Sequence, residues 1–214
     1  MTKILLQGLI FTLALMALVF GQAPTAMAAG DPEKGKELFQ MCAACHGQNG
    51  EGSTILNAPI NAGQNEWYVV RQLKNFQSGI RGSDPRDTFG MQMRPMAMIL
   101  VDDGAVQDVA AYVTSLEAPR PPATVTGDIE AGRKAYVPCA PCHGDRAEGA
   151  KSLNAPTLAH QFDWYIVRQL QNFKQGIRGS HTKDIYGAQM QPMAQMLATD
   201  EQVNDVAAFI ASQE

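Results

Sequence analysis

Net charge, cysteine and long apolar runs are all scarce in this sequence. Its 214 residues carry a formal net charge of only −4, which gives no support for nucleic-acid binding. Hydrophobic residues make up 45% of the chain and charged residues 18%, a composition unlike that of disordered or fibrous chains. No stretch shows the alternation of apolar and polar residues that is typical of a strand. The features that stand out against this background are one apolar run and two cysteine motifs.

The apolar run covers residues 4–20 and follows Lys3. A stretch of small residues then ends in Ala26-Met27-Ala28, which has the A-x-A pattern of a signal-peptide cleavage site. We therefore expect residues 1–28 to be a signal peptide and the mature chain to start near Ala29. The alternative is a retained anchor that tethers the protein to the inner membrane, although a run of 17 residues is at the short limit for a membrane span.

All four cysteines lie in the motifs Cys42-Ala43-Ala44-Cys45-His46 and Cys139-Ala140-Pro141-Cys142-His143. Two thiols three positions apart, with a histidine directly after the second, form the pattern that attaches a haem through thioether bonds and a histidine–iron bond. A redox-active or zinc-binding C-x-x-C pair is the alternative, for which the following histidine would be incidental. The sequence predicts two covalently attached c-type haems, with thioether links from Cys42, Cys45, Cys139 and Cys142 and iron ligands from His46 and His143.

The two motifs belong to a repeat with a period of 97 residues. Residues 67–82 and 164–179 are identical at 12 of 16 positions, and the two halves align without a gap. We predict two domains, residues 29–116 and 128–214, joined by a Pro-rich linker at residues 117–127. Each copy is short enough that a buried haem would supply much of the missing core. Because prolines stiffen the linker, we expect docked domains rather than loosely tethered ones.

Helical patterns run through each copy, so the predicted fold class is all-α. Asp31 and Pro32 form the N-cap and first position of a helix that runs into Cys42, and Asp128 opens its counterpart. Further helices are expected at residues 66–78 and 103–116, and Thr199 with Gln202 forms a capping-box pattern. The apolar stripes of these helices predict the core, and they consist of Trp67, Val70, Leu73 and Phe76, of Val106, Val109, Ala110 and Val113, and of Val203, Val206, Ala207 and Ile210.

The sixth ligand of each iron decides between an electron carrier and a catalyst. Two methionine-rich segments, residues 90–98 and 187–196, offer candidates and are expected to be loops. Only Met93 with Met190, and Met96 with Met193, occupy equivalent positions in both copies. A thioether is a suitable iron ligand, but methionine also fills irregular space beside a large ring. We therefore expect one ligand and one packing methionine in each segment.

Several further polar residues are candidates for secondary roles. Arginines recur at equivalent positions and either neutralise haem propionates or are ordinary surface cations of helices; they are Arg71, Arg81, Arg168 and Arg178. His160 and His181 replace Gly63 and Asp84 of the first copy. Because Met190 is available as a ligand, these two histidines are expected to be surface residues rather than iron ligands.

Together these motifs resemble the diheme cytochrome c4 family. The resemblance rests on the paired C-x-x-C-H motifs, on N-A-P-x-x-A-G/H-Q followed by W-Y-x-V-R-Q-L, and on Q-M-x-P-M-A before a final D-V-A-A-Y/F-V/I helix. It covers essentially the whole chain after residue 28 and implies two tandem class I cytochrome c domains. In that family the methionines at the positions equivalent to Met93 and Met190 are the axial ligands of the haem irons. The family also implies that the Pro59 and Pro156 carbonyls accept a hydrogen bond from the haem-binding histidines.

The resemblance implies a periplasmic electron carrier rather than an enzyme. Such a carrier takes single electrons from a quinol:cytochrome c oxidoreductase or a small carrier to a haem-copper terminal oxidase, and the predicted export agrees with haem attachment outside the inner membrane. A cytochrome subunit of a larger respiratory or dehydrogenase complex is the alternative. A diheme peroxidase needs an iron with an open position, and a thiosulfate-oxidising cytochrome is expected to use a further cysteine. Methionine segments in both copies and the absence of a fifth cysteine disfavour these two enzymes.

Overall fold

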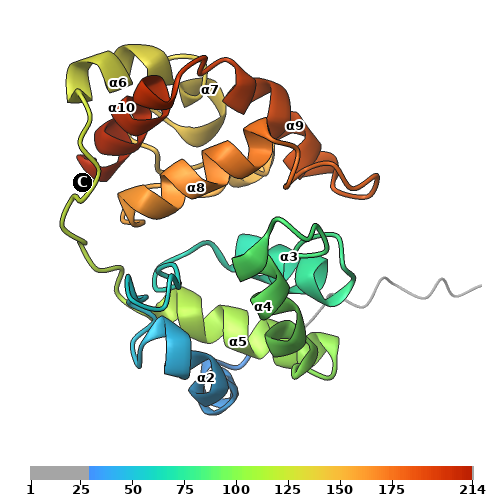
Figure 1. Cartoon of the computed structure of the whole chain (residues 1–214). Coiled ribbons are helices and arrows are strands. Elements are labelled where there is room, and N and C mark those ends of the chain that lie inside the picture. Colours follow the sequence, from blue (N-terminus) through green and yellow to red (C-terminus); the bar gives the residue numbers. More distant parts are fainter. Residues whose placement is uncertain (1–28, 214) are drawn as a thin grey trace, which may run out of the picture.

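The computed structural model describes residues 29–213, so the predicted signal peptide lies outside the described residues. Within residues 29–213 there are helices and two isolated β-bridges but no strand, which confirms the all-α prediction. The two halves stack on one another, and an extended segment joins them along one side (Figure 1). The first half contains α2 (Pro32–His46), α3 (Glu66–Gln77), α4 (Thr88–Met98) and α5 (Asp103–Ser115). The second contains α6 (Ile129–Tyr136), α7 (Ala140–His143), the 3-10 turn η1 (Lys151–Leu153), α8 (Asp163–Lys174), α9 (Ile185–Gln195) and α10 (Asp200–Ala211).

The first helix of each half begins where the sequence predicts. The Asp31 carboxylate accepts from the backbone N–H groups of Glu33 and Lys34, and Asp128 caps α6 in the same way. The prediction that Thr199 caps the last helix is also confirmed, because its side chain accepts from the backbone N–H of Gln202. These caps satisfy N–H groups that have no partner within their own helix.

The core of each half forms where the first and last helices cross. A Cβ atom on Gly35 of α2 would lie 1.9 Å from the carbonyl oxygen of Asp108 in α5, so only glycine allows the two backbones to approach this closely. One aromatic pair fills each crossing, with ring centroids 5.4 Å apart for Phe39 and Tyr112 and 5.1 Å apart for Tyr136 and Phe209. The predicted stripes of α5 and α10 are buried in these cores.

The two halves differ at Pro138, which occupies the position of Met41 in the first half. Proline has no N–H group and its ring collides with the preceding turn, so a helix does not continue through it. Helix α6 accordingly ends at Tyr136 and α7 begins at Ala140, whereas α2 continues without a break to His46.

The prediction that the methionine-rich segments are loops was wrong, because both are helices, α4 and α9. Pro95 and Pro192 would be expected to interrupt a helix, but both lie inside these helices. Proline removes one hydrogen bond from each helix, and an aspartate adds one at each N-terminus. Asp87 Oδ1 accepts from the Gly90 N–H at 2.9 Å, and Asp184 Oδ1 accepts from the Gly187 N–H at 3.0 Å. Each helix also packs on the preceding long helix, α3 or α8.

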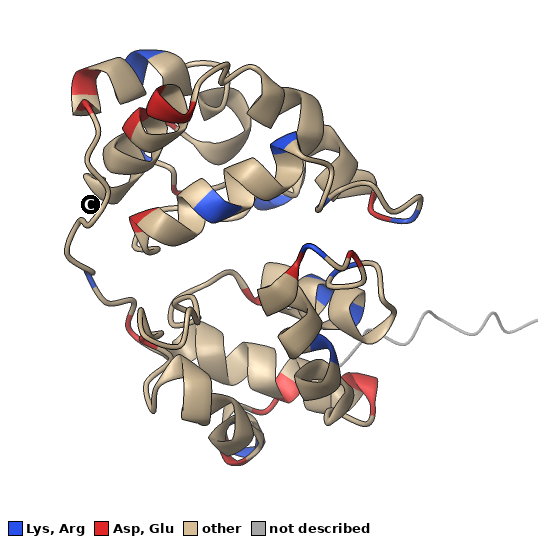
Figure 2. Cartoon of the chain, in the orientation of Figure 1, with Lys and Arg blue, Asp and Glu red and all other residues tan. Residues whose placement is uncertain are grey.

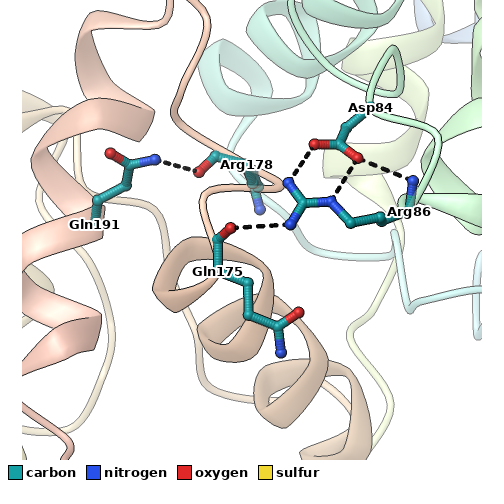
Figure 3. A network of polar contacts seen from close by, with 5 residues as sticks. All are labelled: Asp84, Arg86, Gln175, Arg178 and Gln191. Carbon is teal, nitrogen blue, oxygen red and sulfur yellow. Dashed lines mark hydrogen bonds and ion pairs between the residues drawn. The ribbon is translucent and has the colours of Figure 1, made fainter.

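The two halves are docked, as expected, through contacts that the repeat makes reciprocal. Arg71 donates to the side chain and the carbonyl of Asn154, at 3.2 and 3.1 Å, and Arg168 donates to the equivalent Asn57. Helices α3 and α8 face one another across this boundary in Figure 1. At its edge, Arg86 is held by Asp84 and reaches the carbonyl oxygen of Gln175 at 3.4 Å (Figure 3). Such an isologous arrangement is typical of a two-fold interface between identical subunits.

None of the helices within residues 29–213 combines the length and the apolar character that a membrane-spanning helix needs.

Candidate haem-binding sites

The two predicted iron-binding histidines are held in the same way. His46 ends α2 and His143 ends α7, and each lines a large cavity. The Nδ1 atoms of these histidines lie 2.9 and 3.0 Å from the carbonyl oxygens of Pro59 and Pro156. Burial lowers the pKa of both imidazoles below the ordinary value, although the proline carbonyl acts in the opposite direction. A neutral ring that donates from Nδ1 leaves Nε2 as a metal ligand.

The cysteines lie beside these histidines on the same helical segments. Cys42 and Cys139 are half-buried, Cys45 and Cys142 are exposed, and none of the four is in a disulfide bond. Burial raises the pKa of Cys42 and Cys139, and the second cysteine of each motif adds to this effect. Cys42 and Cys45 both lie in α2, Cys139 is the N-cap residue of α7 and Cys142 lies within it, and all four line the cavity.

The methionine helices also contribute to the wall of the cavity. Met93 and Met96 of α4 line it, and so do Met190 and Met193 of α9. Met91 and Met98 are surface residues with 40% and 61% of their area exposed. The positions shared by both copies are therefore those that face the cavity, which agrees with the comparison of the two repeats.

The cavity suits a large apolar ring that carries carboxylates. It is continuous through both halves, and its lining includes all eight residues predicted to hold the haems. Most of its wall is apolar, while Arg81 presents a buried Nε that has no partner among the described residues. A buried unpartnered guanidinium N–H is a site for an anionic oxygen. The residues therefore fit a c-type haem in each half.

A zinc site is not supported by the described part of the chain. Structural zinc takes four ligands from cysteine, histidine or carboxylate side chains. Within residues 29–213 no group of three or more such side chains converges. Each cysteine pair therefore lacks the further ligands that zinc would require.

The four recurring arginines have a role that the sequence did not indicate. All four line the cavity, and each also donates a hydrogen bond to the opposite half. In Figure 2 the ribbon of α8, which borders the other half, carries segments coloured blue for Lys and Arg. Their acceptors include Asn57, Asn154, Tyr68 and Tyr165, which sequence reasoning missed. The signal was present, because these acceptors are identical in the two copies.

The two additional histidines do not line this cavity. His181 Nδ1 accepts from the backbone N–H of Lys183 at 3.1 Å, just as its counterpart Asp84 accepts from Arg86. His160 has a φ of 64°, where the first copy has Gly63 at 69°. Both positions agree with the expectation that these histidines are not iron ligands.

Comparisons with known proteins support the same assignment. The family model for cytochrome c matches residues 32–117 and 129–214. Cytochrome c4 of Azotobacter vinelandii is 32% identical over 177 residues, which is 78% of this chain and 83% of that protein. The thiosulfate dehydrogenase electron acceptor of Thiomonas intermedia is 30% identical and covers 95% of this chain and 90% of its own length.

A solved structure extends the likeness to the arrangement of the two domains. Reduced recombinant cytochrome c4 from Pseudomonas stutzeri superimposes with a TM-score of 0.70 at 26% identity, covering 87% of this chain and all of that one. The likeness therefore extends over both domains of this chain. From its two C-x-x-C-H motifs, its cavity and these relatives, the chain belongs to the cytochrome c family as a tandem, cytochrome c4-like electron carrier with two covalent c-type haems.

Proposed function

We propose that the protein is a periplasmic shuttle for single electrons in which each iron has histidine and methionine as axial ligands. The ligands would be His46 with Met93 in the first domain and His143 with Met190 in the second. Cys42, Cys45, Cys139 and Cys142 would form the thioether links. The observation that supports this proposal is that all eight residues line the cavity, four from each domain.

The proposed domain organisation follows the repeat. Residues 1–28 would be removed as a signal peptide, and residues 29–116 and 128–214 would form the two cytochrome domains around the linker at 117–127. The mass of the mature, haem-loaded protein tests cleavage and the presence of two haems in one measurement. A mass that includes residues 1–28 would support a retained inner-membrane anchor instead.

The protein's own residues would keep both irons six-coordinate through the redox cycle. A bound haem supplies one-electron chemistry, in which its iron alternates between ferrous and ferric. The Pro59 and Pro156 carbonyls orient the histidine rings and make them better donors. A thioether ligand favours the ferrous state, so Met93 and Met190 would raise the reduction potential, and by occupying the remaining iron position they would leave none open for catalysis.

Replacing Met190 with alanine should expose the iron of the second domain only. We expect loss of the methionine–iron absorption band from about half of the haems, rapid cyanide binding at one haem per chain, and a lower reduction potential for that haem. Met193→Ala is the matched control, because Met193 lines the same cavity. If Met193→Ala removed the band and Met190→Ala did not, the ligand assignment would be wrong.

We propose a quinol-oxidising complex or a small carrier as donor and a haem-copper terminal oxidase as acceptor. A second candidate is suggested by the similarity to the thiosulfate dehydrogenase electron acceptor of Thiomonas intermedia, namely that a dehydrogenase supplies the electrons. The rate at which each purified donor reduces the protein would separate the two. Fast reduction by the dehydrogenase and slow reduction by the quinol-oxidising complex would favour the second candidate.

A further inference from the structure

Two arginines reach across the boundary between the domains. Arg81 Nη2 donates to the hydroxyl oxygen of Tyr165 at 3.0 Å and to Gln169 Oε1 at 3.1 Å. Arg178 Nη2 donates to the hydroxyl oxygen of Tyr68 at 3.0 Å. The 97-residue repeat relates these contacts, so each domain supplies one arginine and receives the other.

Two glutamines connect the arginines to one another. Gln72 Oε1 accepts from Arg81 Nη1 at 2.9 Å and from Arg178 Nη2 at 3.0 Å. Gln169 Oε1 accepts from Arg178 Nη1 at 2.8 Å as well as from Arg81. All of these acceptors are neutral, and within residues 29–213 neither guanidinium forms an ion pair. No described carboxylate is paired with either guanidinium, although Asp87 acts on Arg81 from further away and helps to raise its pKa.

Each arginine nevertheless belongs to the wall of its own domain. Arg81 stacks on Phe76 at 4.6 Å and Arg178 on Phe173 at 4.7 Å, measured to the ring centroids. The carbonyl oxygen of Arg178 accepts from Gln191 Nε2 at 3.1 Å, which ties this residue to α9, the helix of Met190 (Figure 3). Arg178 is thus fixed beside the haem site of its own domain by Gln191, and its guanidinium is oriented by Tyr68 of the other domain.

The charge environment agrees with this arrangement. Burial raises the pKa of Tyr68, but the guanidiniums of Arg178, Arg81 and Arg71 lower it by more, so its pKa lies below the ordinary value. Burial lowers the pKa of Arg81, and the hydroxyls of Tyr165 and Tyr68 raise it by more, so Arg81 stays charged. Tyrosine hydroxyls and guanidiniums therefore stabilise one another across the boundary.

We propose that Tyr68 and Tyr165 are positioning residues, each of which sets the reduction potential of the haem in the opposite domain. Tyr68 restrains Arg178 beside the second haem site, and Tyr165 restrains Arg81 beside the first. A fixed positive charge disfavours the ferric iron, which carries one more positive charge than ferrous iron, so the restraint raises the potential. This proposal rests on the two haem sites assigned under Proposed function.

The test is a redox titration of the full, haem-loaded chain carrying Tyr68→Phe. We expect an about threefold fall in the equilibrium constant for reducing the second haem, equal to about 28 mV for one electron, and an unchanged first haem. Tyr165→Phe should give the reverse pattern. The two potentials are assigned with Met93→His and Met190→His, because exchanging methionine for histidine lowers the potential of one haem only.

Tyr186→Phe provides a matched control. Its ring lies 4.5 Å from the Arg71 guanidinium at the same boundary, its counterpart in the first copy is Phe89, and no described arginine donates to its hydroxyl. We expect both potentials to be unchanged in this variant. An equal shift of the potentials in Tyr186→Phe would overturn the proposal. So would a Tyr68→Phe variant in which the first potential shifts, both shift, or neither shifts. Absence of two covalent haems from the unmodified protein would instead contradict the proposed function.

Discussion

At the scale of single residues, Asp163 shows how one carboxylate fixes the linker. It is only 2% exposed and accepts hydrogen bonds from the backbone N–H groups of Thr124, Val125 and Trp164 and from the Thr124 hydroxyl. Burial raises its pKa, but these donors lower it by more, so its pKa lies below the ordinary value. The carboxylate therefore ties the end of the linker to the start of α8.

Replacing Asp163 with alanine should lower the free energy of unfolding by about 2 kcal/mol at pH 7, because the linker N–H groups lose their acceptor. Since the folded-state pKa is depressed, this stabilisation is present above the unfolded value near 3.9 and is lost as pH falls through the folded-state pKa. Denaturant unfolding at neutral and acidic pH measures both effects. Glu66→Ala, at the equivalent position, should cost less than about 0.5 kcal/mol. A difference between wild type and Asp163→Ala that stayed the same as pH was lowered step by step from about 4 would contradict the explanation.

At the scale of secondary-structure elements, the methionine helices depend on their caps. Each begins with an aspartate that bonds the backbone N–H three residues later, and each contains a proline that removes one internal hydrogen bond. Met190 lies one and a half turns from the start of α9, which is close to both the cap and Pro192. The position of the Met190 sulfur therefore depends on a short helix in which the loss of one further hydrogen bond should matter.

We expect Asp184→Ala to cost about 1 kcal/mol, because the first turn of α9 loses its cap. The methionine–iron band of the second haem should then disappear at a lower temperature than in the wild type, as followed by absorption during heating. Asp184→Asn is the control, since asparagine caps helices about as well as aspartate. If the asparagine variant behaved like the alanine variant, the charge of Asp184 would be the cause and not the cap.

At the scale of the whole molecule, the repeat lets the two domains bind one another as the subunits of a symmetric dimer do. Gln161 departs from that symmetry. Its amide is buried, accepts from the Ile60 N–H at 3.0 Å and donates to the Ile60 carbonyl at 2.9 Å. Its counterpart Gln64 makes one bond to the other domain, to the Thr157 carbonyl at 3.2 Å.

Gln161→Ala should weaken the docking of the domains by about 2 kcal/mol, because both backbone groups of Ile60 lose their partner. We expect calorimetry to show two separated unfolding transitions in place of one, and small-angle scattering to show a larger radius of gyration. Gln64→Ala, which removes one cross-domain bond, should have about half the effect. Equal effects of the two variants would show that the amide of Gln161 has no special part in the docking.

The sequence predicted much of this molecule because its strongest signals are local. The N-caps at Asp31, Asp128 and Thr199 and the apolar stripe of α10 depend on neighbours within four residues, and all were confirmed. The methionine segments were wrongly predicted as loops. Their prolines are a local signal for a break, whereas packing on α3 and α8 holds the helices together.

Without coordinates, the sequence determined the two haem-attachment motifs, the duplicated domain and the helical fold, since each is written in the spacing of residues along the chain. The tertiary structure alone decided that Arg81 and Arg178 cross to the opposite domain and that Asp163 holds the linker. These facts depend on which surfaces meet when two domains dock. A hydrogen bond between residues about 85 to 110 positions apart leaves no periodic signal in the sequence.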